Sequence, residues 1–184
     1  METLSSFTLE LIREYGANLG WMEERRFDWV GVLQPMLKRV VDAKTILVIT
    51  DKDRGWLNDY IITRLNRSFL ERPLLPVLSL ETIFPKLDSV KESEHFELLE
   101  DMLNLSFPNG YTYFYIGEGS DPRANLPKRD ENSFMWLLDE KNPNAFYLSS
   151  KDEFLDQKLL SLVRLLDKSI DAALFMEVDL ESLV

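Results

Sequence analysis

Apolar residues recur every three or four positions over the first part of the chain, which is the spacing of one stripe along an α-helix. The stripe consists of Leu4, Phe7, Leu11 and Tyr15. It predicts a first helix that ends near Gly16 or Gly20, since glycine is a common helix stop. A second, longer stripe predicts a helix over roughly residues 21 to 43, in which Pro35 favours a kink or a break. We therefore expect two helices before any strand.

Short apolar runs bounded by polar and turn-forming residues predict strands farther along the chain. The run Thr45–Thr50, TILVIT, is β-branched and shows no alternation, which is typical of a strand covered on both faces. Pro76 lies within the second run and favours an edge or strand-end position for it. The remaining predicted strands are Pro73–Leu80, Tyr111–Ile116 and Ala145–Ser150.

Helical patterns follow the predicted strands. They cover Trp56–Asn66, Ser89–Asn104, Ser133–Glu140 and Phe154–Leu174, and the polar stretch 117–132 is expected to be a loop. The last pattern is the clearest, because its apolar beat persists for about six turns. Strands that alternate with helices predict an α/β fold with a parallel, Rossmann-like sheet of four to five strands sandwiched by helices. We expect one domain over residues 1–184, with an added N-terminal helical pair.

The N-terminal pair over residues 1–43 is surplus to the helices needed to cover such a sheet. A surplus amphipathic helix often contacts a partner chain. The stripe Leu4, Phe7, Leu11 and Tyr15 is therefore a candidate oligomer interface. The alternative is an ordinary covering helix.

The loop after the first predicted strand, Asp51–Gly55, lies where an open α/β sheet usually binds its ligand. Phosphate prefers glycine-rich or hydroxyl-rich loops, because bare backbone N–H groups must point at it. Asp51 and Asp53 put negative charge there, and two unit charges about 5 Å apart repel by about 1 kcal/mol even in water. We interpret these carboxylates mainly as helix caps, with Thr50 and Asp53 in a capping box before Arg54.

Other catalytic chemistry finds little support in the residues. Asp51 and Asp53 could hold Mg²⁺ as in a receiver domain, but the third predicted strand runs into Gly117 instead of the aspartate that such a site needs. His95 is the single histidine and lies in a helix-surface pattern among glutamates, so a solvated position is favoured over a general base. We expect no metal and no cofactor.

Composition narrows the class of protein. The chain has 184 residues, 45% of them apolar, with a formal net charge of −11 and no cysteine. A duplex-DNA binder needs a basic face to displace counterions, so we expect no direct nucleic-acid contact. The acidic balance indicates either simple solubility or a basic protein partner. The lack of cysteine excludes disulfides and fits a cytoplasmic protein. No apolar run approaches membrane-spanning length, so no membrane association is expected.

Tryptophan is frequent for a chain of this length, and aromatic residues concentrate in protein interfaces. The four are Trp21, Trp29, Trp56 and Trp136. Trp56 follows the Asp51–Gly55 loop, where a ligand would otherwise enter. A buried core position is the alternative for each of them.

Several segments, taken together in this order and spacing, resemble the HobA family. They are LGWMEERR, ILVITDKDRGWLNDYIITRLN, ERPLLPVL, SFMWLLDE and LDQKLLSLVRLLDKSIDAALF, and the resemblance runs from about Gly20 to Phe175. The first helix and the stretch from Glu118 to Glu131 are less alike.

The resemblance implies a fold like that of phosphosugar-isomerase (SIS) domains, without their sugar-phosphate site and without catalysis. It implies a homotetramer, arranged as a dimer of dimers, that binds the N-terminal domain of the replication initiator DnaA and promotes DnaA assembly at the replication origin. DiaA would be the structural counterpart in other bacteria. A phosphosugar-binding protein or isomerase of the same fold is the alternative.

The comparison with DiaA-like chains implies that Leu174 and Phe175, at the end of the last helix, contact DnaA. A core position for both side chains is the alternative. Trp56, Asp51 and Asp53 are further candidates for the same contact.

Overall fold

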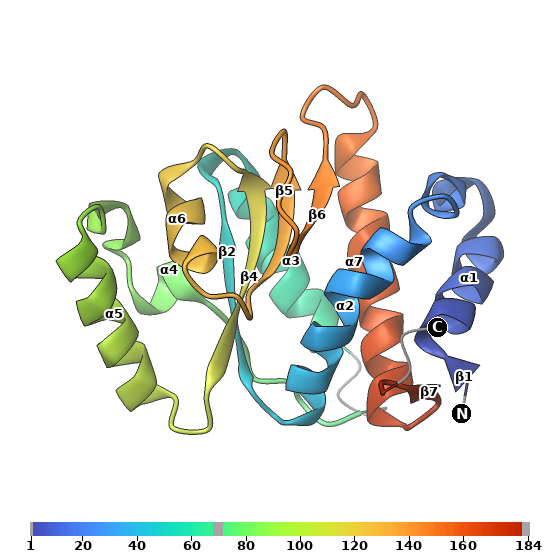
Figure 1. Ribbon diagram of the computed structural model, residues 1–184, viewed down its shortest axis with the longest axis horizontal. Coiled ribbons are helices and arrows are strands. Elements are labelled where there is room, and N and C mark those ends of the chain that lie inside the picture. Colours follow the sequence, from blue (N-terminus) through green and yellow to red (C-terminus); the bar gives the residue numbers. More distant parts are fainter. Residues whose placement is uncertain (1, 68–71, 182–184) are drawn as a thin grey trace. The chain divides into compact units, whose positions relative to one another are not determined.

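A parallel five-stranded sheet organises Ala43–Leu148 in the computed structural model of the chain, which describes residues 2–67 and 72–181. The strands are β2 (Thr45–Thr50), β3 (Val77–Ser79), β4 (Tyr111–Glu118), β5 (Phe134–Leu138) and β6 (Ala145–Leu148). Their order in the sheet is β3-β2-β4-β5-β6 (Figure 1). This order reverses direction between β2 and β4, as in doubly-wound α/β proteins. The predicted α/β class and parallel sheet are confirmed.

Helices on both sides of the sheet follow from the handedness of the crossovers. The chain moves one way from β2 to β3 and the other way from β3 to β4 and β5, so right-handed connections place their helices on opposite faces. Figure 1 shows α3 on one side and α4, α5 and α6 on the other. These helices are α3 (Gly55–Leu65), α4 (Leu80–Ile83), α5 (Ser93–Ser106) and α6 (Asn125–Lys128).

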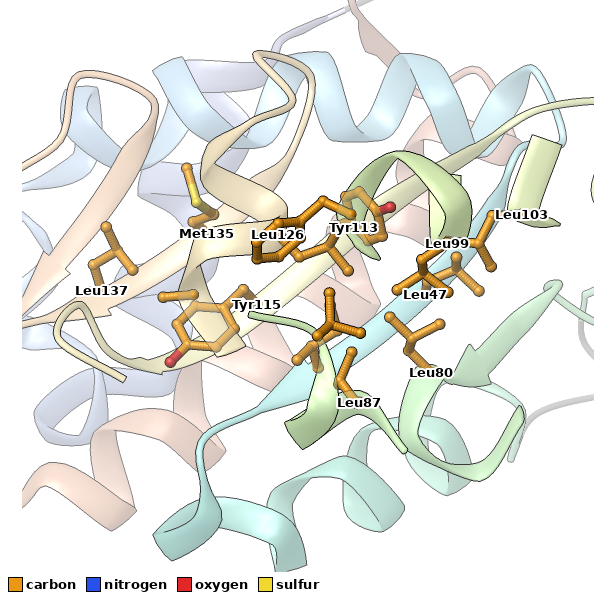
Figure 2. Packing of buried hydrophobic residues seen from close by; sticks show 14 residues of the cluster. Leu47, Leu80, Leu87, Leu99, Leu103, Tyr113, Tyr115, Leu126, Met135 and Leu137 are labelled. Atoms are coloured by element: carbon orange, nitrogen blue, oxygen red, sulfur yellow. The ribbon is translucent and has the colours of Figure 1, made fainter. Parts of the chain in front are cut away.

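The core on the α5 side of the sheet combines alternate residues of three strands with the inner faces of the helices (Figure 2). Side chains of β2, β4 and β5 point to this face at every second position, which is the period of a strand. The strands contribute Leu47, Ile49, Tyr113, Tyr115, Met135 and Leu137, and α5 contributes Phe96, Leu99 and Leu103. Burial of this apolar surface is the main driving force for packing α5 on the sheet.

The prediction of a helix over Ser133–Glu140 is wrong, because Phe134–Leu138 forms the strand β5. All five of its residues are buried, so no polar positions reveal a period, and Leu, Met and Glu are good helix formers. Pairing with β4 and β6 overrides that local preference. The helix of this connection lies earlier, at α6, inside the stretch expected to be a loop.

Two smaller expectations concern the ends of elements in the same unit. β3 covers only Val77–Ser79 and lies at the sheet edge, as Pro76 indicates. The helix predicted from Ser89 begins at Ser93 instead. The Ser89 hydroxyl donates to the Lys86 carbonyl and belongs to a separate 3₁₀ turn, Leu87–Ser89.

The second unit consists of Met1–Asp42 and Ser149–Val184. Its helices are α1 (Leu4–Tyr15), α2 (Arg26–Val41) and α7 (Leu155–Leu174), and α2 packs against both others. The helix predicted from residue 21 begins at Arg26 and continues unbroken through Pro35. The prediction of one domain over 1–184, and the likeness to phosphosugar-isomerase domains, stay predictions.

A two-residue strand precedes the first helix, so the expectation of two helices before any strand is wrong. β1 (Glu2–Thr3) pairs in parallel with β7 (Val178–Asp179) from the other end of the chain. Such a short pair has no sequence period and depends on the packing that brings the two ends together. Among the described residues, no helix is long and apolar enough to span a membrane.

The stripe of α1 is divided between interior and surface. Leu4 and Leu11 are buried, whereas Phe7 and Tyr15 are only half-buried. An oligomer contact through α1 would therefore use mainly Phe7 and Tyr15.

Candidate functional site

The carboxylate of Asp51 occupies the point where β2 and β4 end side by side, which is the usual ligand position in a doubly-wound sheet. Asp51 is 3% exposed. Its Oδ1 accepts from the Arg54 backbone N–H at 3.0 Å, and its Oδ2 accepts from the Glu118 N–H at 2.8 Å. The Arg54 guanidinium forms an ion pair with the same carboxylate.

This arrangement makes Asp51 an internal anion. The backbone N–H groups that a bound phosphate would need at this edge of the sheet already donate to its side chain. Gly117 keeps the space for it, because a Cβ at position 117 would lie 2.6 Å from Asp51 Oδ2. Capping by Asp51 is confirmed, but the Thr50–Asp53 box is wrong, since Asp51 is the cap of the turn Lys52–Arg54.

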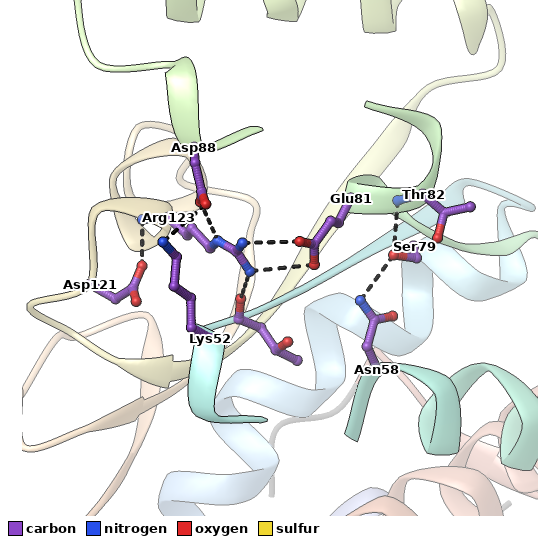
Figure 3. A network of polar contacts seen from close by, with 9 residues as sticks. Lys52, Asn58, Ser79, Glu81, Thr82, Asp88, Asp121 and Arg123 are labelled. Carbon is purple, nitrogen blue, oxygen red and sulfur yellow. Dashed lines mark hydrogen bonds and ion pairs between the residues drawn. The ribbon is translucent and has the colours of Figure 1, made fainter. Parts of the chain in front are cut away.

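A second cluster of charges surrounds Arg123 beside the same strand end (Figure 3). Its guanidinium donates to Asp88 Oδ1 at 2.8 Å, to Glu81 Oε1 at 3.0 Å and to the Thr50 carbonyl at 3.2 Å. Lys52 Nζ lies 3.1 Å from Asp88 Oδ2. The cluster thus ties the end of β2 to α4 and to the segment before α5.

Arg123 is positioned by a small capping structure of its own. The Asp121 side chain accepts from the Arg123 N–H at 2.8 Å, and Pro122 follows the cap at the first helical position, where its missing N–H costs nothing. The pKa of the Arg123 side chain is raised, chiefly by its hydrogen bond to Asp88.

Hydrogen bonds from Arg123, and then from Lys52, lower the pKa of Asp88 from 3.8 to about 2. A carboxylate with a lowered pKa stabilises the fold above its unfolded pKa and loses that contribution as pH falls toward 2. Because the Asp88 side chain is half exposed, we expect the effect to be about 1 kcal/mol. Urea unfolding of Asp88→Asn and the wild type should show this gap in the free energy of unfolding at pH 6, closing between about pH 4 and 2. A gap that is the same at all pH values would contradict the role of Asp88.

A crevice of about 310 Å³ remains beside this cluster. It is lined by Lys52, Leu87, Asp88, Val90, Lys91, Asp121, Pro122 and Arg123. Two of its three basic side chains, Arg123 and Lys52, pair with Asp88, and the third is the exposed Lys91. Among the described residues, no group of three or more His, Asp or Glu could hold a metal ion. The geometry stabilises the strand ends, and it engages Arg123 and Lys52 with carboxylates of the protein itself.

The other predicted residues of this unit lie on the surface. Asp53 and Trp56 are exposed, in the turn after Asp51 and at the start of α3. Asp51 itself is engaged in the interior cluster. Of the three, Asp53 and Trp56 can therefore offer side chains to a partner. His95 is exposed on α5, as its sequence pattern indicates.

In the other unit, the last turn of α7 presents Phe175 to solvent. Phe175 is 54% exposed and the following Met176 is 77% exposed, whereas Leu174 is half-buried. Two backbone bonds close the helix end, from Met176 N to the Ala173 carbonyl and from Glu177 N to the Ala172 carbonyl. This is the Schellman arrangement, with Met176 at φ 57° in the position that usually requires glycine. A hydrogen-bonded helix end thus carries two exposed apolar side chains.

Sequence comparison identifies the family to which these features belong. The profile of HobA, a DNA replication regulator, matches residues 1–180. The chain belongs to the HobA family.

Known HobA proteins are similar to the chain over nearly its whole length. The DNA replication regulator protein HobA of Helicobacter pylori (strain ATCC 700392 / 26695) is 25% identical over 188 residues, which cover 98% of this chain and all of that protein. A crystal structure of an H. pylori HobA–DnaA (domain I-II) complex matches with a TM-score of 0.75, and one of H. pylori HobA alone with 0.72. Each is 24% identical and covers 97% of this chain and 99% of its own.

Two features of this HobA-family chain were not predicted from its sequence pattern. Arg123 lies in a stretch interpreted as a loop, although Asp121-Pro122 is a recognisable helix start. Met176 carries no signal as a helix stop, because its left-handed conformation suits glycine or asparagine. The exposed apolar pair Phe175–Met176 becomes evident only with the burial of the rest of α7.

Proposed function

We propose that the chain is a non-catalytic regulator of replication initiation that binds the N-terminal domain of DnaA and promotes DnaA assembly at the origin. It acts in the cytoplasm as a homotetramer, arranged as a dimer of dimers. The family match over residues 1–180 carries the proposal. The complex of a relative with DnaA domain I-II supports the choice of partner.

The usual ligand position at the ends of β2 and β4 is occupied by side chains of the protein itself, which supports a binding role over catalysis. Asp51 takes the backbone donors that would bind a phosphate, and Arg123 is saturated by its own carboxylates. A phosphosugar would have to displace both ion pairs, each of which lies at least partly out of water. Breaking buried pairs costs several kcal/mol, which a small anion would have to recover.

The DnaA contact in this proposal centres on Phe175, with Leu174 beside it, while Asp53 and Trp56 are secondary candidates. Aromatic side chains are typical anchors of protein interfaces. For the oligomer, Phe7 and Tyr15 are the accessible members of the α1 stripe. Several bound DnaA domains on one tetramer would raise their mutual effective concentration, toward millimolar for short flexible tethers.

Light scattering on a sizing column tests partner and assembly together. The protein alone is expected to elute with the mass of a tetramer and to gain mass when mixed with the N-terminal domain of DnaA from its own organism. The matched control is DnaA without that domain, which should leave the mass unchanged. A tetramer whose mass does not rise with the domain would contradict DnaA binding. A monomeric mass would remove the basis for multivalent assembly.

Phosphosugars test whether the position that Asp51 occupies at the ends of β2 and β4 still binds a ligand. We expect no thermal shift with a panel of them, whereas a ligand at 100 times its Kd would add about 2.7 kcal/mol of stability. A clear shift with any of them would favour the enzyme or sugar-phosphate alternative.

A further inference from the structure

The outer face of α5 carries an apolar stripe that the fold does not cover. Leu98 is 62% exposed, Met102 46% and Leu105 85%. These positions are four and three residues apart, so they lie on one side of the helix over about two turns. The adjacent, inward side of α5 already packs in the core through Phe96, Leu99 and Leu103. The stripe is therefore additional to what α5 needs for folding.

A groove continues this stripe toward the segment before α5. Its cavity measures about 240 Å³ and is lined by Phe84, Ser89, Val90, His95, Leu98, Leu99 and Met102. That volume is below the roughly 300–1,000 Å³ of typical small-molecule pockets. It suits one or two anchoring side chains of a larger partner, and its surface is mostly apolar.

Carboxylates border the other side of the stripe. Residues 92–101 contain five acidic side chains, of which Glu100 pairs with Arg129 at 3.5 Å. Glu94, Glu97 and Asp101 are exposed, and helical spacing places Glu94 and Asp101 beside Leu98. An apolar groove with an acidic border complements a helix that has an apolar face flanked by Lys or Arg.

The same charges disfavour a second copy of this chain as the occupant. Two α5 helices packed antiparallel across a two-fold axis would place their acidic borders against each other, and like charges across an interface cost free energy. The occupant that fits is a different protein with a basic surface.

We propose that the α5 groove, formed by Phe84, Val90, His95, Leu98 and Met102, binds a basic amphipathic helix of a second protein partner. The groove is a separate site from the Phe175 surface proposed for DnaA. The apolar anchors supply affinity, and Glu94, Glu97 and Asp101 supply orientation and a salt-dependent association rate. The proposal does not depend on DnaA binding.

A direct test uses a fluorescent Leu/Lys amphipathic peptide of about 18 residues, long enough to form a helix. Its affinity for the full-length protein is measured by anisotropy, and a photo-crosslinking version maps the contact by mass spectrometry. Met102→Lys is expected to weaken binding at least tenfold, about the loss of one interface anchor. Asn104→Lys is the matched control, because it adds the same charge to the exposed polar side of α5 outside the groove.

The outcomes separate this surface from its alternatives. Crosslinks on α5, with loss of affinity in Met102→Lys and little in Asn104→Lys, support the proposal. Equal losses in both variants mean unspecific charge attraction and overturn it. Self-association of the wild type that Met102→Lys abolishes assigns the face to a second copy and also overturns it. Displacement of the peptide by the N-terminal domain of DnaA would overturn the claim of a separate site, whereas Phe175→Ala should leave peptide binding unchanged.

Discussion

Replacing Asp51 by Ala is expected to lower the free energy of unfolding by about 3–5 kcal/mol, the usual cost of removing one partner of a buried ion pair. The variant leaves the largely buried Arg54 guanidinium, whose side chain is 11% exposed, without its carboxylate, and leaves the N–H groups of Arg54 and Glu118 without their acceptor. Urea unfolding followed by circular dichroism measures the change. Such a loss is a large share of the stability of a typical domain, about 5–15 kcal/mol.

The neighbouring Asp53→Ala is the matched control for this prediction. It removes a carboxylate two residues away, but from an exposed position, so we expect a change within about 0.5 kcal/mol. If the two variants were equally stable, the internal-anion role of Asp51 would be wrong. Asp51 would then have to be considered again as a residue that faces a partner.

This contrast between Asp51 and Asp53 shows how far the loop could be understood from its sequence. The pattern of a strand followed by an acidic turn predicts a cap and argues against phosphate. It does not distinguish the buried carboxylate from the exposed one. That distinction depends on Glu118, which lies 67 positions along the chain and meets Asp51 only because β2 and β4 are neighbours.

The sheet itself was predictable where local and tertiary preferences agree. TILVIT and YTYFYI have β-branched or aromatic side chains that suit buried strands, and the apolar beat of α7 is long enough to be unambiguous. The prediction of a helix at β5 was wrong because a fully buried run of five residues has no polar positions to reveal its period. The β1–β7 pair was not predicted, because strands of only two residues show no pattern of apolar and polar positions.

Surface features were the least predictable part. An apolar residue on a helix is expected in the core, and only its exposure in the folded chain shows otherwise. Phe175 and Leu98 both continue regular helical patterns, yet both are more than half exposed. These residues therefore provide the sharper evidence for interaction, because the fold leaves more than half of each side chain exposed to solvent.

Replacing Phe175 by Ala is expected to weaken binding of the N-terminal domain of DnaA by about 30-fold or more, the effect of losing a central aromatic anchor. The substitution removes an exposed ring and leaves the backbone bonds that close α7, so stability and tetramer mass should stay unchanged. Isothermal titration calorimetry gives the affinity, and light scattering gives the mass.

Phe154→Ala is the matched control at the other end of α7. Phe154 is 58% exposed, close to the 54% of Phe175, so the two variants lose the same group at similar exposure but at opposite ends of the helix. Weaker DnaA binding in Phe175→Ala alone would assign the DnaA contact to the C-terminal end of α7. Equal binding in both variants would move the DnaA contact elsewhere, with Trp56 and Asp53 as the next candidates. Loss of the fold in Phe175→Ala would instead mean that the ring contributes to the core in solution.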